Sequence, residues 1–218
     1  MKTLEYFDTI KEGVTGYLKT VPSFDLAGRS AYGNSNELSL LCEVLSKNKV
    51  NNVIEIGTYK GIASALFSSV IDGTVHTINI NLEELKIANV LWDRLGINNV
   101  KSYLGDSLKI LPELLQKVDD INFIYVDGQH FLDYPLKEYE IILNNLKFVN
   151  NCLIYFDDGA TDVQRVVKKY NIGTLEIPAG PDIAVRGFDT IGEFYFDKKI
   201  IESSLWYFSK EGKRIYNP

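Results

Sequence analysis

Polar and mostly acidic residues follow five apolar segments of this 218-residue sequence. Carboxylates are concentrated after two of these segments, as Asp127 after the fourth and as Asp157 and Asp158 after the fifth. A buried carboxylate without a partner is costly, so this grouping indicates a hard cation or a hydrogen-bonded cofactor. Oxygen ligands alone favour Mg²⁺ over zinc. His130 lies close by in the sequence and could accept a proton at neutral pH.

Each of these residues also has a structural interpretation. Asp157 and Asp158 could cap the helix that follows them. We favour a metal site because Asp127 is expected at the end of the adjacent strand. His130 is one of two histidines in the sequence, and both the structural and the base interpretation stay open for it.

The first apolar segment leads into a glycine turn, Val53-Ile-Glu-Ile-Gly-Thr-Tyr-Lys-Gly61. Its β-branched residues predict a buried parallel strand, and Gly57 allows a sharp turn and the close approach of a ligand. The next helix would offer free N–H groups to a nucleotide-like ligand. Glu55 suits a cationic cofactor, and the glycine spacing is not that of dinucleotide-binding proteins. Taken alone, the segment could be an ordinary strand–helix turn.

Strand and helix patterns alternate through most of the chain, which predicts a parallel sheet with helices on both faces. Such a sheet binds ligands at the carboxyl ends of its strands. We therefore predict an α/β, Rossmann-like fold with a mostly parallel, seven-stranded sheet. The expected strands are residues 53–56, 74–80, 100–104, 121–126, 152–156, 172–177 and 191–196.

Composition and charge limit the domain organisation and the partners. We expect one domain over residues 1–218, with an N-terminal helical cap or lid over 1–48 and a cofactor-binding core with a C-terminal hairpin over 49–218. The net charge of −6 without a basic block argues against nucleic acid or an anionic membrane as partner. The absence of a signal-peptide pattern and of a membrane-length apolar run, with two cysteines in apolar segments, predicts a cytoplasmic protein.

Five motifs occur in a fixed order between about Gly33 and Tyr170. They are Val53-Ile-Glu-Ile-Gly-Thr-Tyr-Lys-Gly61, Thr77-Ile-Asn-Ile-Asn81, Gly105-Asp-Ser107 with Leu111-Pro112, Tyr125-Val-Asp-Gly-Gln-His130, and Tyr155-Phe-Asp-Asp-Gly159. In this order and spacing the sequence resembles class I S-adenosylmethionine-dependent methyltransferases. It is most similar to the small-molecule O-methyltransferases of the catechol, caffeoyl-CoA and macrolide-sugar types.

The resemblance implies a site for S-adenosylmethionine. The implied cofactor-binding residues are Glu55, Gly57, Thr58, Tyr59, Gly61, Asn79, Asp106, Ser107 and Asp127. Within this set the glycine turn would line the methionine and ribose, and Asp106 and Ser107 would face the adenine. Asn79 falls where the family usually has an acid that binds both ribose hydroxyls.

The resemblance also implies a reacting centre. Asp127, Asp157 and Asp158 fall where metal-dependent members hold Mg²⁺, and His130 falls near the general base. Transfer of a methyl group to oxygen needs positioning and a deprotonated hydroxyl, which a divalent cation favours. We therefore expect an O-methyltransferase acting on a hydroxyl of a small molecule, assisted by Mg²⁺, with a homodimer possible. The alternatives are a metal-independent methyltransferase and, because of Asn79, a methyltransferase-like domain that binds a ligand or partner without catalysis.

Overall fold

The computed structural model describes residues 9–10, 12–14, 16, 38, 41–42, 45–46, 49–129, 132–145, 152–156, 173–176 and 193–196. Within them, strands and helices alternate from residue 52 to residue 156, as the sequence pattern predicts. The elements are β1 (Asn52–Ile56), α3 (Ile62–Val70), β2 (Val75–Asn79), α4 (Leu82–Arg94), β3 (Val100–Leu104), α5 (Ser107–Lys117), β4 (Ile121–Val126), α6 (Tyr134–Asn145), β5 (Leu153–Phe156), β6 (Gly173–Glu176) and β7 (Glu193–Phe196).

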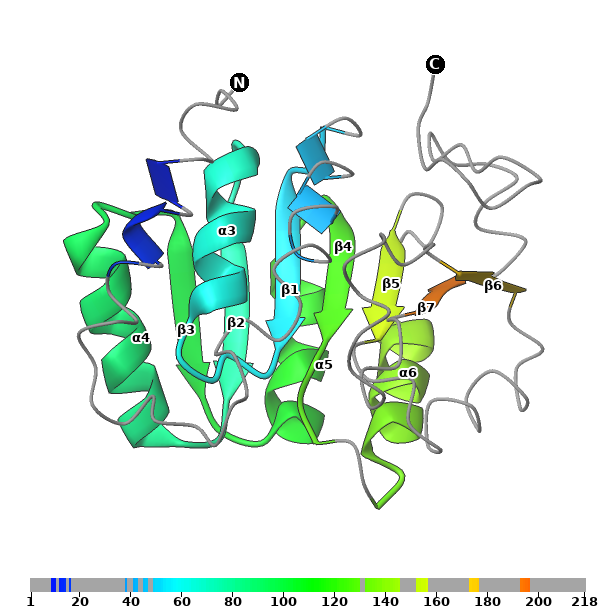
Figure 1. Cartoon of the computed structure of the whole chain (residues 1–218). Coiled ribbons are helices and arrows are strands. Elements are labelled where there is room, and N and C mark those ends of the chain that lie inside the picture. Colours follow the sequence, from blue (N-terminus) through cyan, green and yellow to red (C-terminus); the bar gives the residue numbers. More distant parts are fainter. Residues whose placement is uncertain are drawn as a thin grey trace, which may run out of the picture.

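The strands form one sheet in the order β3-β2-β1-β4-β5-β7-β6 (Figure 1). Strands β1 to β5 are parallel, and the short strands β7 and β6 extend the sheet in antiparallel pairing beyond β5. The predicted Rossmann-like, mostly parallel sheet is confirmed. The chain order reverses beside β1, which pairs with β2 on one side and β4 on the other. In open α/β sheets a crevice for ligands lies outside the carboxyl ends of the strands at such a reversal.

Helices cover both faces of the sheet because alternate residues of each buried strand are apolar on both sides (Figure 1). On one face, α3 and α4 pack with Val53 of β1 in a cluster that includes Phe67 and Trp92. On the other face, α5 and α6 pack with Ile54 and Ile56. Glu55 interrupts the apolar pattern on the α3 face, so a carboxyl group is buried inside this layer.

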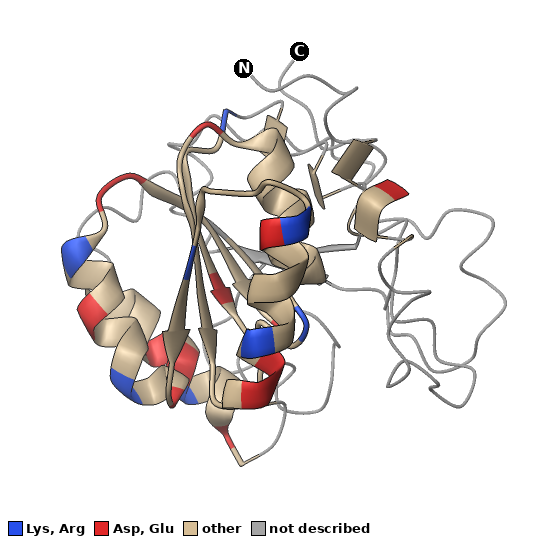
Figure 2. Cartoon of the chain, turned by 90° about the vertical axis from the view of Figure 1, so that its left-hand side faces the viewer, with Lys and Arg blue, Asp and Glu red and all other residues tan. Residues whose placement is uncertain are grey.

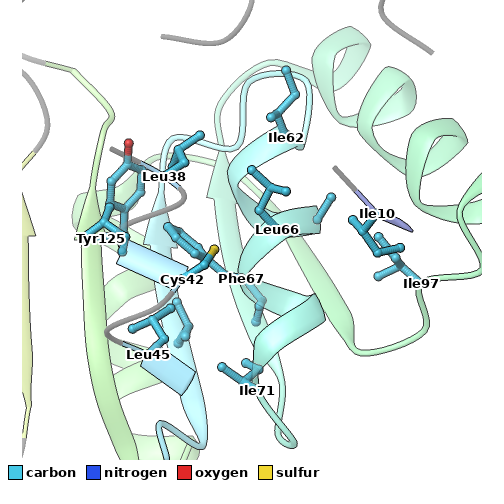
Figure 3. Packing of buried hydrophobic residues seen from close by; sticks show 14 of the residues in the cluster. Ile10, Leu38, Cys42, Leu45, Ile62, Leu66, Phe67, Ile71, Ile97 and Tyr125 are labelled. Atoms are coloured by element: carbon cyan, nitrogen blue, oxygen red, sulfur yellow. The ribbon is translucent and has the colours of Figure 1, made fainter. Parts of the chain in front are cut away.

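Helical residues near the N-terminus add to the core on the α3 face. Leu38, Cys42 and Leu45 point toward Phe67 of α3 and Tyr125 of β4 (Figure 3). Each of these side chains is less than 8% exposed. The described part of the predicted N-terminal cap therefore packs against the sheet layer. Residues 17–37 of that cap and the predicted C-terminal hairpin lie outside the described residues.

Charged residues of both signs are distributed along the helices (Figure 2). Lys86 pairs with Glu83 at 2.7 Å on α4, and Lys117 pairs with Glu113 at 2.9 Å on α5. Such exposed pairs contribute little to stability. Within the part of the chain that the structure describes, none of the helices has the length and apolar character to cross a membrane.

Candidate functional site

Backbone hydrogen bonds tie four strand ends together at one edge of the sheet. The N–H of Gly57 donates to the carbonyl of Ile78 at 2.9 Å, which joins the turn after β1 to the end of β2. The N–H of Asp127 donates to Ile56 at 2.7 Å, which joins the end of β4 to β1. The N–H of Gly105 donates to the carbonyl of Asn79 at 2.8 Å, which joins β3 to β2. The nine predicted cofactor-binding residues, from Glu55 to Asp127, therefore lie at the ends of strands that end side by side or just after those ends.

At Gly57 the turn after β1 lies very close to the backbone that follows β4. Its φ of +99° lies in the region that side chains rarely adopt. A Cβ atom at this position would lie 1.9 Å from the carbonyl oxygen of Asp127. Only glycine fits at this position, because the turn after β1 lies directly against the backbone that follows β4.

The far end of the glycine turn is held by an indole. Gly61 has a φ of +79°, and its carbonyl accepts a hydrogen bond of 2.9 Å from the Nε1–H of Trp92 on α4. The sequence pattern places Trp92 in the core, which its 4% exposure confirms. Its second role, anchoring the turn, was missed, because residues 31 positions apart give no local signal for a hydrogen bond.

Glu55 is fully buried beneath the turn. One carboxyl oxygen accepts a hydrogen bond from the hydroxyl of Ser64 on α3. The other oxygen, Oε1, has no hydrogen-bond partner among the described residues. Burial raises the pKa of Glu55 to about 7, and the hydrogen bond from Ser64 opposes that rise. A buried acid with a free oxygen is costly unless a cationic or donating ligand meets it.

Asn79 at the end of β2 forms a hydrogen bond with the carboxylate of Glu84. Its Nδ2 donates to Oε2 of Glu84 at 2.9 Å and to the carbonyl of Asn81 at 3.3 Å. Glu84 lies in the first turn of α4, where Asn81 caps the helix. The end of β2 therefore carries a negative charge although its own residue is neutral. The sequence interpretation missed Glu84, since nothing in its spacing indicates that it turns back to Asn79.

The end of β3 leads into α5 through two polar residues. Asp106 caps the helix by accepting a 3.0 Å hydrogen bond from the N–H of Leu108, as the cap interpretation predicts. The hydroxyl of Ser107 donates to Oε1 of Glu138 on α6 at 2.5 Å.

Glu138 is completely buried, and its Oε2 has no partner among the described residues. Burial raises the pKa of Glu138 to about 7; the hydrogen bond from Ser107 lowers it and the charge of Asp106 raises it. This residue was also missed. The only signal for it was an acid inside the apolar stripe of its helix.

Only part of the predicted reacting centre lies among the described residues. Asp127 follows β4, and the hydroxyl of Tyr125 donates to its Oδ2 at 3.4 Å. His130, Asp157 and Asp158 lie outside the described residues, so the predicted base and two of the predicted metal ligands stay predictions. Among the described residues, no group of three His, Cys, Asp or Glu side chains is placed to hold a metal ion.

Comparisons with known proteins agree with this geometry. The sequence pattern of the O-methyltransferase family matches residues 29–165, which is more than half of the chain. A protein-L-isoaspartate O-methyltransferase from Methanococcus maripaludis is 30% identical over 111 residues, which is 50% of this chain and 46% of that protein. One from Methanocella arvoryzae is 32% identical over 78 residues, covering 35% of this chain and 42% of that protein. The chain therefore spans less than half the length of the curated relatives that it matches.

Solved structures share the fold at low identity. An O-methyltransferase from Bacillus cereus in complex with S-adenosylhomocysteine has a TM-score of 0.66 at 16% identity, over 87% of this chain and 91% of that one. The O-methyltransferase TomG from Streptomyces achromogenes, in complex with S-adenosylmethionine, has a TM-score of 0.65 at 15% identity, over 86% and 87% of the two chains.

Proposed function

Because the chain belongs to the O-methyltransferase family, we propose that it transfers a methyl group from S-adenosylmethionine to a hydroxyl of a small molecule. The family membership confirms the assignment that the resemblance implied, which is a class I S-adenosylmethionine-dependent O-methyltransferase. It also confirms the predicted enzyme class, a methyltransferase. The acceptor, the base and the use of Mg²⁺ are part of the proposal. The observation that carries it is the buried Glu55, with a free oxygen, beneath the glycine turn.

The described residues fit this cofactor in three places. When ionised, the buried carboxylate of Glu55 would favour a cationic methionine above it through its charge, whereas it would repel a phosphate group. Gly57 allows the turn after β1 to lie against the backbone of Asp127, so that the ends of β1 and β4 can border the cofactor together. Asn79 and Glu84 together offer an amide and a carboxylate to ribose hydroxyls, so the missing acid at the end of β2 is replaced in function by Glu84.

When bound, S-adenosylmethionine supplies a methyl group activated by a sulfonium. The protein's own residues would bind and orient this donor and would remove the proton from the acceptor hydroxyl. The turn from Gly57 to Gly61, fixed by Trp92, would hold the donor in place, and positioning of this kind supplies a large share of the rate in a bimolecular displacement. His130 would accept the proton of the acceptor hydroxyl, and Asp127, Asp157 and Asp158 would hold the Mg²⁺ that favours its loss.

Calorimetric titration with S-adenosylhomocysteine tests the cofactor site. We expect binding by the wild type and, at pH 8, a loss of about tenfold to hundredfold in affinity for Glu55→Gln, because a charge-assisted hydrogen bond becomes a neutral one. Glu113→Gln on α5 is the matched control, because this glutamate is exposed and only pairs with Lys117 one helical turn away. The affinity of this variant for S-adenosylhomocysteine should equal that of the wild type. Absence of binding to the wild type would overturn the proposal and favour a methyltransferase-like domain without catalysis.

Methyl transfer measured with and without EDTA tests the metal. We expect EDTA to reduce the rate by at least about a hundredfold and Mg²⁺ to restore it, since the cation favours the deprotonated hydroxyl. Asp127→Asn should show the same loss, whereas Asp120→Asn, at an exposed position whose positive φ suits asparagine, should behave as wild type. Full activity in EDTA would select the metal-independent alternative. A small hydroxylated acceptor and an isoaspartyl peptide should be compared in the same assay, since the curated relatives are named for the latter.

A further inference from the structure

Glu55 is a buried acid whose charge changes near neutral pH. Its side chain is 0% exposed, and its Oε1 has no hydrogen-bond partner among the described residues. Burial raises the pKa of Glu55 to about 7, although the hydrogen bond from Ser64 to Oε2 favours the charged form. In the protein without cofactor, protonated and ionised carboxyl groups are therefore both present at neutral pH.

The titratable groups around Glu55 come from several elements. Tyr125 of β4 is in register with it, and Cys42 of the N-terminal helical residues packs in the same layer. Charged side chains of the same edge are Lys60, which is in the turn and 6% exposed, and Asp127, which follows β4. None of these groups is a cause of the raised pKa of Glu55, which depends on burial and hydrogen bonding. A cation of a ligand would therefore add a charge that this carboxyl does not sense in the free protein.

Hydroxyl groups connect the surroundings of Glu55 with the glycine turn. Thr77 of β2 is in register with Glu55, and its Oγ1 is 2.5 Å from Oγ1 of Thr58 in the turn. Thr77 is 0% exposed and Thr58 is 3% exposed. Because these groups are shielded from water, a charge held at the turn acts on the carboxyl with little screening.

We propose that binding of the cofactor expels the proton of Glu55 to solvent, so that the affinity for the cofactor rises with pH across the neutral range. The inference rests on the proposed function, because it assumes that the cationic amino-acid part of the cofactor lies beside the glycine turn. That charge stabilises the carboxylate and so favours breaking of the O–H bond of Glu55. Below pH 7 the cation must displace this proton, which weakens binding, whereas above pH 7 the carboxylate is already formed.

Calorimetric titration with S-adenosylhomocysteine between pH 6 and pH 8 tests the proton release. We expect the affinity of the wild type to rise about tenfold over this range, with about half a proton released at pH 7. The released proton is measured from the dependence of the binding enthalpy on the ionisation enthalpy of the buffer. Glu55→Gln should show neither the rise nor the release. 5′-Methylthioadenosine, which lacks the cationic amino-acid part, should bind to the wild type without this pH dependence.

Two further variants locate the proton. Ser64→Ala removes a hydrogen bond that favours the charged form, so the midpoint of the affinity profile should move to higher pH. Glu138→Gln removes the other buried acid with a pKa of about 7, which lies on the opposite face of the sheet, and should keep the tenfold rise whatever its absolute affinity. Glu113→Gln, at an exposed position, should follow the wild type. Thermal unfolding verifies that each variant is folded.

The outcomes separate this inference from the proposed function. If the wild type does not bind S-adenosylhomocysteine at any of these pH values, the proposed function is overturned. If it binds with a flat profile and no proton release, or if Glu55→Gln keeps the rise, only the role of Glu55 is overturned. Loss of the rise in Glu138→Gln would assign the proton to the other acid and overturn it as well. If Glu55→Gln does not fold, a shifted profile in Ser64→Ala and a flat one with 5′-methylthioadenosine still support it.

Discussion

Alanine at position 57 is expected to lower the free energy of unfolding by about 3 kcal/mol or more and to abolish binding of S-adenosylhomocysteine. The added Cβ would lie 1.9 Å from the carbonyl oxygen of Asp127 and 2.5 Å from its carbonyl carbon. Both atoms are backbone, so no side-chain rotation relieves the overlap. The 2.7 Å hydrogen bond between Asp127 and Ile56 would have to open, which separates the end of β4 from β1.

Gly96→Ala is the matched control for this variant. Gly96 also has a positive φ, of +66°, but a Cβ atom there would have nothing within 4 Å. Its replacement should cost only the left-handed backbone conformation, about 1 kcal/mol, and should leave cofactor affinity unchanged. Chemical denaturation of both variants measures the difference. Equal destabilisation of the two variants would show that the close approach of Gly57 to Asp127 is not maintained in solution.

The two buried acids Glu55 and Glu138 are expected to make the protein less stable as the pH rises from about 4.5 to about 7. Burial raises the pKa of each from 4.5 to about 7. The folded state therefore holds two protons that the unfolded chain releases first. The stability that these protons contribute is fully present below pH 4.5 and is lost as the pH rises through 7. A shift of this size corresponds to about 3 kcal/mol for each group.

Glutamine variants isolate this contribution. Relative to the wild type, Glu55→Gln and Glu138→Gln should each gain about 3 kcal/mol in free energy of unfolding between pH 5 and pH 8, whereas Glu113→Gln should follow the wild type. The comparison between variants is needed because His76, whose pKa burial lowers to about 4, acts in the opposite direction below pH 6.5. Urea denaturation at several pH values measures the profiles. Profiles that stay parallel would mean that both acids ionise in the folded state as they do in the unfolded chain.

The sequence by itself determined the sheet and the line of strand ends. Apolar runs such as Ile121–Val126 specify buried strands through burial on both faces, and the helical spacing between them specifies parallel connections. Once the strands are parallel, their carboxyl ends must lie on one edge, so Gly57, Asn79, Ser107 and Asp127 could be assigned to one site before any coordinates. The need for glycine at position 57 was likewise predictable, because a sharp turn followed a buried strand.

Only the tertiary structure decided which side chains support that edge. Ser107 meets Glu138, and Gly61 meets Trp92, across 31 residues in each case. Asn79 gains the carboxylate of Glu84 through the packing of one helix end against one strand. Local periodicity reports which face of an element is buried but not which residue of another element lies opposite. Hydrogen-bond partners depend on register, helix rotation and distance between layers, and these quantities are fixed only when the whole core packs.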